Sequence, residues 1–130
     1  MTDRIDLGEI AARCEATAIG SFDLDKAILR ALGYTWRGLG YWFHDDSHQW
    51  RGPARFTSSI DAALALIPEG EREWELHTAF RDERFGRYQA RVNIDLLPDD
   101  PDETGPQGIA NGATPALAIC AAALRAREAR

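Results

Sequence analysis

The sequence predicts an α+β fold in which a small antiparallel sheet of three or four strands is sandwiched between helices. Three observations lead to this prediction. Some stretches repeat apolar residues at helical spacing, while residues 73–80 and 87–94 alternate apolar and polar residues, as a strand with one wet face does. Residues 34–50 combine aromatic residues with glycine and turn formers, which is typical of a hairpin. No repeat and no linker divides the chain, so we expect one domain over residues 1–130.

Two helices are expected first. Residues 5–16 form one of them, and the second begins near Ser21 or Asp23 and ends at Gly33, because glycine commonly stops a helix. Each helix has one apolar face, and the residues on these faces are Leu7, Ile10, Ala11 and Cys14 in the first helix and Leu24, Ile28, Leu29 and Leu32 in the second.

A short hairpin is expected after the second helix. It holds a glycine-rich turn, a strand over residues 41–44 and a second strand over residues 48–50 that pairs back on the first. Because side chains alternate along a strand, we expect Tyr41 and Phe43 on one side of this hairpin and Trp42 on the other.

A third helix and two longer strands complete the middle of the chain. Ser58 or Ser59 is expected to cap the helix, which ends at Pro68. The two alternating stretches then pair as a hairpin around a charged loop over residues 81–86. Residues 97–112 hold three prolines, four acidic residues and three glycines, so we expect a mobile surface loop there.

The last helix has a clear start. The hydroxyl of Thr114 can cap free backbone N–H groups, and Pro115 fits the first helical position. Small residues in its apolar stripe let the helix approach its neighbour closely, and we expect that neighbour to be the sheet. Cysteines 14 and 120 both fall on apolar helix faces and are expected to be reduced, buried thiols. The stripe consists of Leu117, Cys120, Ala121 and Leu124.

Three stretches together resemble a family of small phage and prophage proteins, the phage alpha-beta-alpha (ABA) sandwich domain. They are LDKAILRALGY at residues 24–34, FTSSIDAALALIPEG at residues 56–70 and GATPALAICAAALRAR at residues 112–127. The resemblance implies a sheet sandwiched between helices and a phage or prophage origin, and it implies no activity and no catalytic residue. Two features differ from the family pattern, namely the charged strand start at residues 71–73 and the acidic, proline-rich loop at residues 98–106.

Charge and composition argue against some classes of partner. The formal net charge is −6, so direct binding to nucleic acid or to an anionic membrane surface is not expected. No apolar run approaches the roughly 20 residues of a membrane span, and the chain starts without a signal-peptide pattern. We therefore expect a cytoplasmic protein, and the resemblance to phage proteins implies that this is the cytoplasm of the host cell. No nucleophile–base arrangement and no phosphate-binding loop stands out, so we expect no catalysis and no cofactor.

An aromatic and basic cluster is the first candidate site. Five aromatic side chains lie within fifteen residues, and three arginines lie nearby that could hold phosphates. The aromatic residues are Trp36, Tyr41, Trp42, Phe43 and Trp50, and the arginines are Arg37, Arg51 and Arg55. Aromatic rings stack on bases, and arginine can donate two parallel hydrogen bonds to a phosphate. The cluster therefore favours a nucleotide-like ligand. The alternative is that one set of rings enters the core while the other covers a helix or a partner chain.

A second candidate cluster contains His44, Asp45, Asp46 and His48, which are residue types that bind zinc, manganese or iron. The alternative is an ordinary solvated turn, because Asp and Ser commonly form turns.

The start of the last helix is a third candidate, for an anion. Free N–H groups at a helix N-terminus favour negative charge near Thr114, and Gly112 would let a phosphate approach closely. The alternative is plain capping.

These features lead to three hypotheses. The first is a non-enzymatic phage or prophage accessory protein, acting in counter-defence, that sequesters a small host ligand such as a nucleotide signal or blocks a host protein. The second is an anti-CRISPR-like inhibitor that mimics nucleic acid charge through acidic residues at 45–46, 69–75 and 99–103. The third is a metal-dependent hydrolase using the cluster from His44 to His48. Self-association into a homo-oligomer stays open, because a second copy can cover the edge of a short hairpin.

Overall fold

The computed structural model describes residues 6–67, 72–78, 88–94 and 107–129. The predicted α+β class is confirmed, and β1 and β6 are strands beyond the predicted ones. The helices are α1 (Leu7–Ala16), α2 (Phe22–Ala31), α3 (Ile60–Leu64) and α4 (Pro115–Ala129). The strands are β1 (Tyr34–Trp36), β2 (Trp42–His44), β3 (Gln49–Arg51), β4 (Arg72–Thr78), β5 (Tyr88–Ile94) and β6 (Gln107–Gly112).

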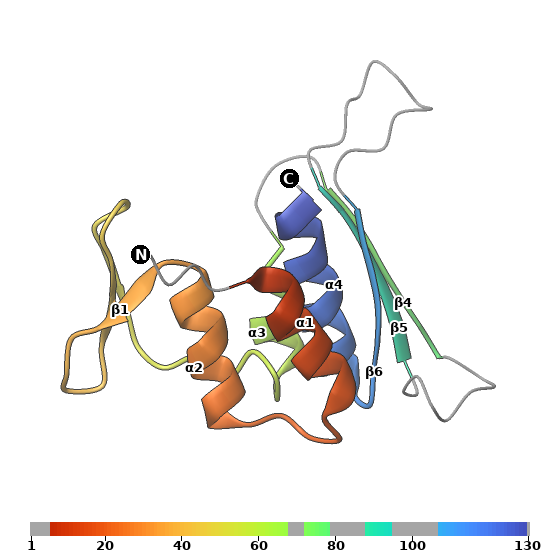
Figure 1. Cartoon of the computed structure of the whole chain (residues 1–130), viewed down its shortest axis with the longest axis horizontal. Coiled ribbons are helices and arrows are strands. Elements are labelled where there is room, and N and C mark those ends of the chain that lie inside the picture. Colours follow the sequence, from red (N-terminus) through yellow and green to blue (C-terminus); the bar gives the residue numbers. More distant parts are fainter. Residues whose placement is uncertain (1–5, 68–71, 79–87, 95–106, 130) are drawn as a thin grey trace, which may run out of the picture.

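The described strands form two three-stranded antiparallel sheets. We call the sheet of β1, β2 and β3 the aromatic sheet and the sheet of β4, β5 and β6 the long sheet. Figure 1 shows the aromatic sheet at one end of the long axis of the molecule and the long sheet at the other, with the helices between them. Helices pack against strands of both sheets, whereas a single sheet of three or four strands was expected from the sequence.

Helix α4 lies at the centre of the core. Every residue from Ala116 to Leu124 is buried, so the helix is enclosed on all sides and not only along one apolar stripe. It packs against the long sheet, as expected, and also against α1 and α3 (Figure 1). None of the helices that the structure describes has both the length and the apolar character needed to cross a membrane.

Two glycines of β6 explain how closely α4 approaches the long sheet. A Cβ atom on Gly108 would collide with the backbone of α4 at Ala122 and Ala126, and one on Gly112 would lie 2.5 Å from the backbone nitrogen of Ala118. The helix and the strand therefore touch backbone to backbone at both ends of β6, which only glycine allows.

Strand β6 corrects the expectation of a surface loop over residues 97–112. The loop prediction is wrong for Gln107–Gly112, which pairs along its whole length with β5. This pairing satisfies the backbone groups of a segment whose side chains are small, so the strand forms despite its low strand propensity. Residues 95–106 lie outside the described part of the chain, as do the expected helix stop at Pro68 and the loop at residues 81–86.

The helix starts follow local capping chemistry. The Ser21 hydroxyl accepts a hydrogen bond from the backbone N–H of Leu24 at 3.2 Å, and Ser59 caps α3 in the same way. Thr114 accepts from the N–H of Leu117 at 3.2 Å, which confirms the capping expected there.

Strand register divides the side chains of the aromatic sheet between two faces. Trp36 lies opposite Trp42, which lies opposite Arg51, so these three share one face, and this inner face is turned toward α2. The expected separation of Trp42 from Phe43 is confirmed. The inner face carries Tyr34, Trp36, Trp42, His44, Gln49 and Arg51, and the outer face carries Thr35, Phe43 and Trp50.

Candidate ligand-binding site

A pocket of about 290 Å³ lies between α2 and the inner face of the aromatic sheet. We call it the α2 pocket. Its interior is mostly apolar, because Leu29, Trp42 and Ala54 are buried side chains of the core. Its lining residues are Phe22, Asp25, Lys26, Leu29, Trp36, Trp42, Pro53 and Ala54. Concave and apolar surfaces with a few polar groups are typical of small-molecule sites.

Two tryptophans form one wall of the α2 pocket. Their rings meet edge to face, with centroids 5.4 Å apart. Trp42 is only 3% exposed, whereas Trp36 is 51% exposed, so a buried ring supports a ring that remains open to a ligand. The guanidinium group of Arg30 lies 5.7 Å from the centre of the Trp42 ring, which fixes one more side of this wall.

Two cations lie beside the same wall. Lys26 and Arg30 are one helical turn apart on α2, and together with Trp36 and Trp42 they line a neighbouring space of about 270 Å³. Neither makes an ion pair with a carboxylate in the described ranges. Like charges four residues apart destabilise a helix by about 0.2–0.5 kcal/mol, so this pair has no local benefit to α2. An anion held between them would remove the repulsion.

A buried carboxylate holds the chain segment that closes the pocket. Asp25 on α2 is 3% exposed, and its Oδ1 accepts hydrogen bonds from both the backbone N–H (2.9 Å) and the hydroxyl (2.7 Å) of Thr57. The hydroxyl oxygen of Thr57 also accepts from the N–H of Ser21 at 3.0 Å. These bonds fix the segment after β3 against the start of α2, which sets the width of the α2 pocket.

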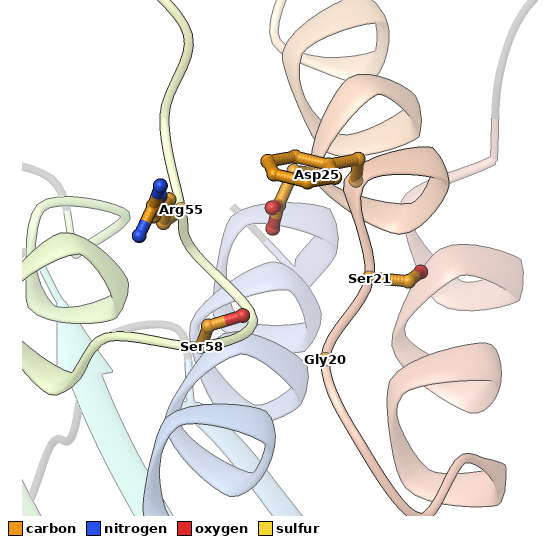
Figure 2. Close-up of a pocket in the computed structure, with 6 residues that line it drawn as sticks. Gly20, Ser21, Asp25, Arg55 and Ser58 are labelled. Atoms are coloured by element: carbon orange, nitrogen blue, oxygen red, sulfur yellow. The ribbon is translucent and has the colours of Figure 1, made fainter.

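Asp25 also borders a smaller hollow of about 190 Å³ at the start of α2. Figure 2 shows its carboxylate between α2 and the segment that carries Arg55 and Ser58. The sequence reasoning missed Asp25 and Thr57. A signal was present, because Asp25 falls next to Leu24 and among the apolar positions of α2, where a charged residue needs a partner.

The structure brings only some of the predicted site residues together. Trp36 and Trp42 line the α2 pocket, whereas His44 and Arg51 line a separate polar pocket on the same inner face. Trp50 is 61% exposed on the outer face, where it packs against Phe43 with ring centroids 4.7 Å apart.

Tyr41 and the two residues at the start of α4 lie elsewhere. Tyr41 is exposed in the turn before β2, and its backbone oxygen accepts from the N–H of Arg37. Gly112 is buried against α4, so the room for an anion expected beside it is filled by the helix backbone. Thr114 uses its hydroxyl as a cap.

Both ring nitrogens of His44 are occupied by protein groups. Nε2 lies 3.0 Å from the carbonyl oxygen of Leu32 and donates to it, and Nδ1 accepts from the backbone N–H of Ser47 at 3.1 Å. Binding a metal through either nitrogen would break one of these bonds. Among the described residues, no three His, Cys, Asp or Glu side chains lie close enough to hold a metal ion. This geometry does not favour the metal-dependent hydrolase.

Two buried thiols belong to the core. Cys14 and Cys120 are free and buried, as expected, and the Cys120 Sγ donates to the carbonyl oxygen of Phe56 at 3.0 Å. Burial raises the pKa of the Cys14 thiol to about 12 and the pKa of the Cys120 thiol well above its ordinary value. Because the thiolate is the reactive form, neither group is suited to act as a nucleophile.

No protein-family model, curated protein or solved structure matches this chain. The resemblance to the phage ABA sandwich family stays a prediction, and the geometry of the α2 pocket carries the functional conclusion.

Proposed function

We propose that this chain is a binding protein without catalytic activity, and that it holds a small planar anion, such as a nucleotide, in the α2 pocket. One observation carries the proposal. A half-exposed tryptophan, Trp36, is supported by a buried one over an apolar pocket, directly beside Lys26 and Arg30.

The wall and the cations suit the two ends of such a ligand. Stacking of a base on Trp36 is worth about 1–3 kcal/mol, and each hydrogen bond to a charged partner adds about 1.5–3 kcal/mol. Lys26 and Arg30 are placed to donate such bonds to a phosphate at the mouth of the pocket. Binding through these two kinds of contact needs no bond to be made or broken, which suits a protein that acts by occupancy.

The size of the pocket sets how much of the ligand it takes. A volume of about 290 Å³ is at the lower end of the roughly 300–1,000 Å³ that ligand pockets span. We expect the base to enter the pocket and the phosphate to stay near the protein surface, where the two cations lie.

The resemblance seen in the sequence extends the proposal to a biological role. A phage or prophage protein that binds a nucleotide by occupancy would sequester a host nucleotide signal in the host cytoplasm and so counter host defence. The α2 pocket is the part of the structure that supports this role.

Isothermal titration of the purified chain against a panel of nucleotides tests the proposal. Trp36→Ala should weaken the tightest ligand by about tenfold or more, because the stacking wall is lost. Trp50→Ala is the matched control, since it removes an equally large exposed ring from the outer face of the same sheet, and its affinity should match that of the unchanged chain.

Three results would each count against part or all of the proposal. A folded sample that gives no heat with any nucleotide would remove the nucleotide class, and equal losses in Trp36→Ala and Trp50→Ala would place the ligand outside the α2 pocket. Turnover of the bound ligand by the pure protein would remove the non-enzymatic part alone.

A further inference from the structure

A second pocket, which we call the polar pocket, also lies on the inner face of the aromatic sheet and has a volume of about 270 Å³. It is lined by two arginines, Arg51 and Arg127, and by the polar side chains of His44, Ser47 and Gln49. None of its described lining residues is acidic, although the chain as a whole carries a net charge of −6. Cationic and hydrogen-bonding groups that gather around one hollow of an acidic protein point to an anionic ligand.

Arg51 is the centre of this pocket. Its guanidinium carbon lies 5.7 Å from the centre of the Tyr34 ring and 5.2 Å from that of Phe56, so aromatic rings hold the group in place. Arg51 makes no ion pair with a carboxylate in the described part of the chain, and its buried Nε has no hydrogen-bond partner there. The N–H groups of a guanidinium lie in its own plane and point away from rings that contact its face. An oxyanion can therefore accept hydrogen bonds from them.

Neighbouring groups supply further donors. The Ser47 hydroxyl oxygen lies 2.9 Å from His44 Nδ1. Because the backbone N–H of Ser47 also donates to that nitrogen, the hydroxyl can exchange this bond for one to a ligand oxygen. The amide of Gln49 is exposed at the mouth of the pocket. Arg127 is anchored by a hydrogen bond from its Nε to the carbonyl oxygen of Leu66 at 2.6 Å, which fixes a second positive group across the pocket.

We propose that the polar pocket is a binding site for a tetrahedral oxyanion, either inorganic phosphate or the phosphate of a monoester, with Arg51 as its main ligand-binding group. Donors from a guanidinium, a hydroxyl and an amide that approach from different strand and turn positions match the several oxygens of a phosphate better than the two of a carboxylate. This site is separate from the α2 pocket and does not depend on the function proposed for that pocket.

Nuclear magnetic resonance of ¹⁵N-labelled full-length chain at low ionic strength tests this site. Inorganic phosphate and AMP should both shift the Arg51 Nε–H and Gln49 side-chain signals in a saturable way, whereas adenosine should not. Arg51→Met keeps the packing stem and should weaken phosphate binding by about tenfold or more, since a charge-assisted bond is lost. Arg37→Met is the matched control. Arg37 lies over Phe43, so this substitution removes one positive charge from the outer face of the same sheet.

Several outcomes would overturn the proposal. One is a phosphate shift that never saturates, and another is an equal loss in Arg51→Met and Arg37→Met, which would mean general charge attraction. A third is adenosine moving the Arg51 signal as far as AMP does, because the phosphate would then not be the recognised group. If Arg51→Met does not fold, Gln49→Ala at an exposed position should weaken phosphate about threefold, and an unchanged affinity would contradict the site. Trp36 indole signals report the α2 pocket separately, so failure at one site is distinguishable from failure at the other.

Discussion

Replacing Gly108 by alanine tests the backbone-to-backbone packing on which the core depends. The new Cβ would meet the carbonyl oxygen of Ala122 and would lie 2.6 Å from the backbone nitrogen of Ala126. Ordinary van der Waals contact begins at 3.4 Å, so relief of the second contact alone needs a shift of about 0.8 Å. Both neighbours are helix backbone, which cannot rotate away as the end of a long side chain can.

The expected cost follows from how α4 is held. Added volume in a well-packed core destabilises by about 1–3 kcal/mol. We expect Gly108→Ala to cost about 3 kcal/mol, at the upper end of this range, because α4 is buried on all sides and cannot shift away from the new methyl group. Gly52→Ala is the matched control, since no atom lies within 4 Å of its Cβ position. This control should be neutral or stabilising by up to about 1 kcal/mol, through the unfolded chain alone.

Chemical denaturation of both variants beside the unchanged chain measures the difference. Both replacements change the unfolded chain alike. The difference between their free energies of unfolding therefore measures the cost of the steric clash in the folded state. A thermal melt should show a fall in Tm of about 10 °C for Gly108→Ala. Equal stability of the two variants would mean that β6 does not pack directly on α4, and the description of the core would have to be abandoned.

Two further predictions concern buried polar groups. Thr57→Val should destabilise the chain by about 2 kcal/mol, because the buried Asp25 carboxylate loses one of its two hydrogen-bond donors. Thr57→Ser keeps the hydroxyl, so its stability should stay within about 1 kcal/mol of the unchanged chain. Denaturant titration measures both variants, and equal losses of stability would contradict the role of the hydroxyl. Burial raises the Cys14 pKa from 9.0 to about 12, so between these pH values the unfolded chain releases a proton that the folded chain keeps. Stability should therefore fall as pH rises above 9, and between pH 8 and pH 10 the unchanged chain should lose about 1 kcal/mol more than Cys14→Ala. Parallel pH profiles of the two proteins would show that the Cys14 thiol is not desolvated.

Helix boundaries could be predicted because capping is local. Ser21, Ser59 and Thr114 each bond to an N–H three residues ahead, so the residues that decide the helix start lie side by side in the sequence. The long strands β4 and β5 could be predicted for a similar reason, since alternation is visible within each one.

Strand β6 could not be predicted in the same way. Its inner face consists of Gly108, Ala110 and Gly112, which have low strand propensity and follow a proline-rich stretch. The informative signal is that small residues recur at a period of two opposite a helix rich in alanine. That signal becomes clear only when the strand and α4 are considered together, because their close packing on each other is what requires small side chains in both.

The candidate site was predicted only in part. The sequence singled out the aromatic residues as candidates, but strand register decides that Trp36 and Trp42 face α2 while Trp50 faces away. Placement of α2 over the sheet depends on contacts distant in sequence, such as the bond between Asp25 and Thr57. Sequence spacing carries no information on either point, so the pocket itself could not be foreseen.

The central claim is that Trp36 and Trp42 form the wall that receives a planar ligand. Nuclear magnetic resonance of the indole N–H signals during titration with the tightest nucleotide tests it most directly. We predict that the signals of Trp36 and Trp42 shift together and saturate, while those of Trp50 and Trp74 stay in place. A shift confined to Trp50 or Trp74, or saturable binding that leaves the Trp36 signal unmoved, would contradict the claim.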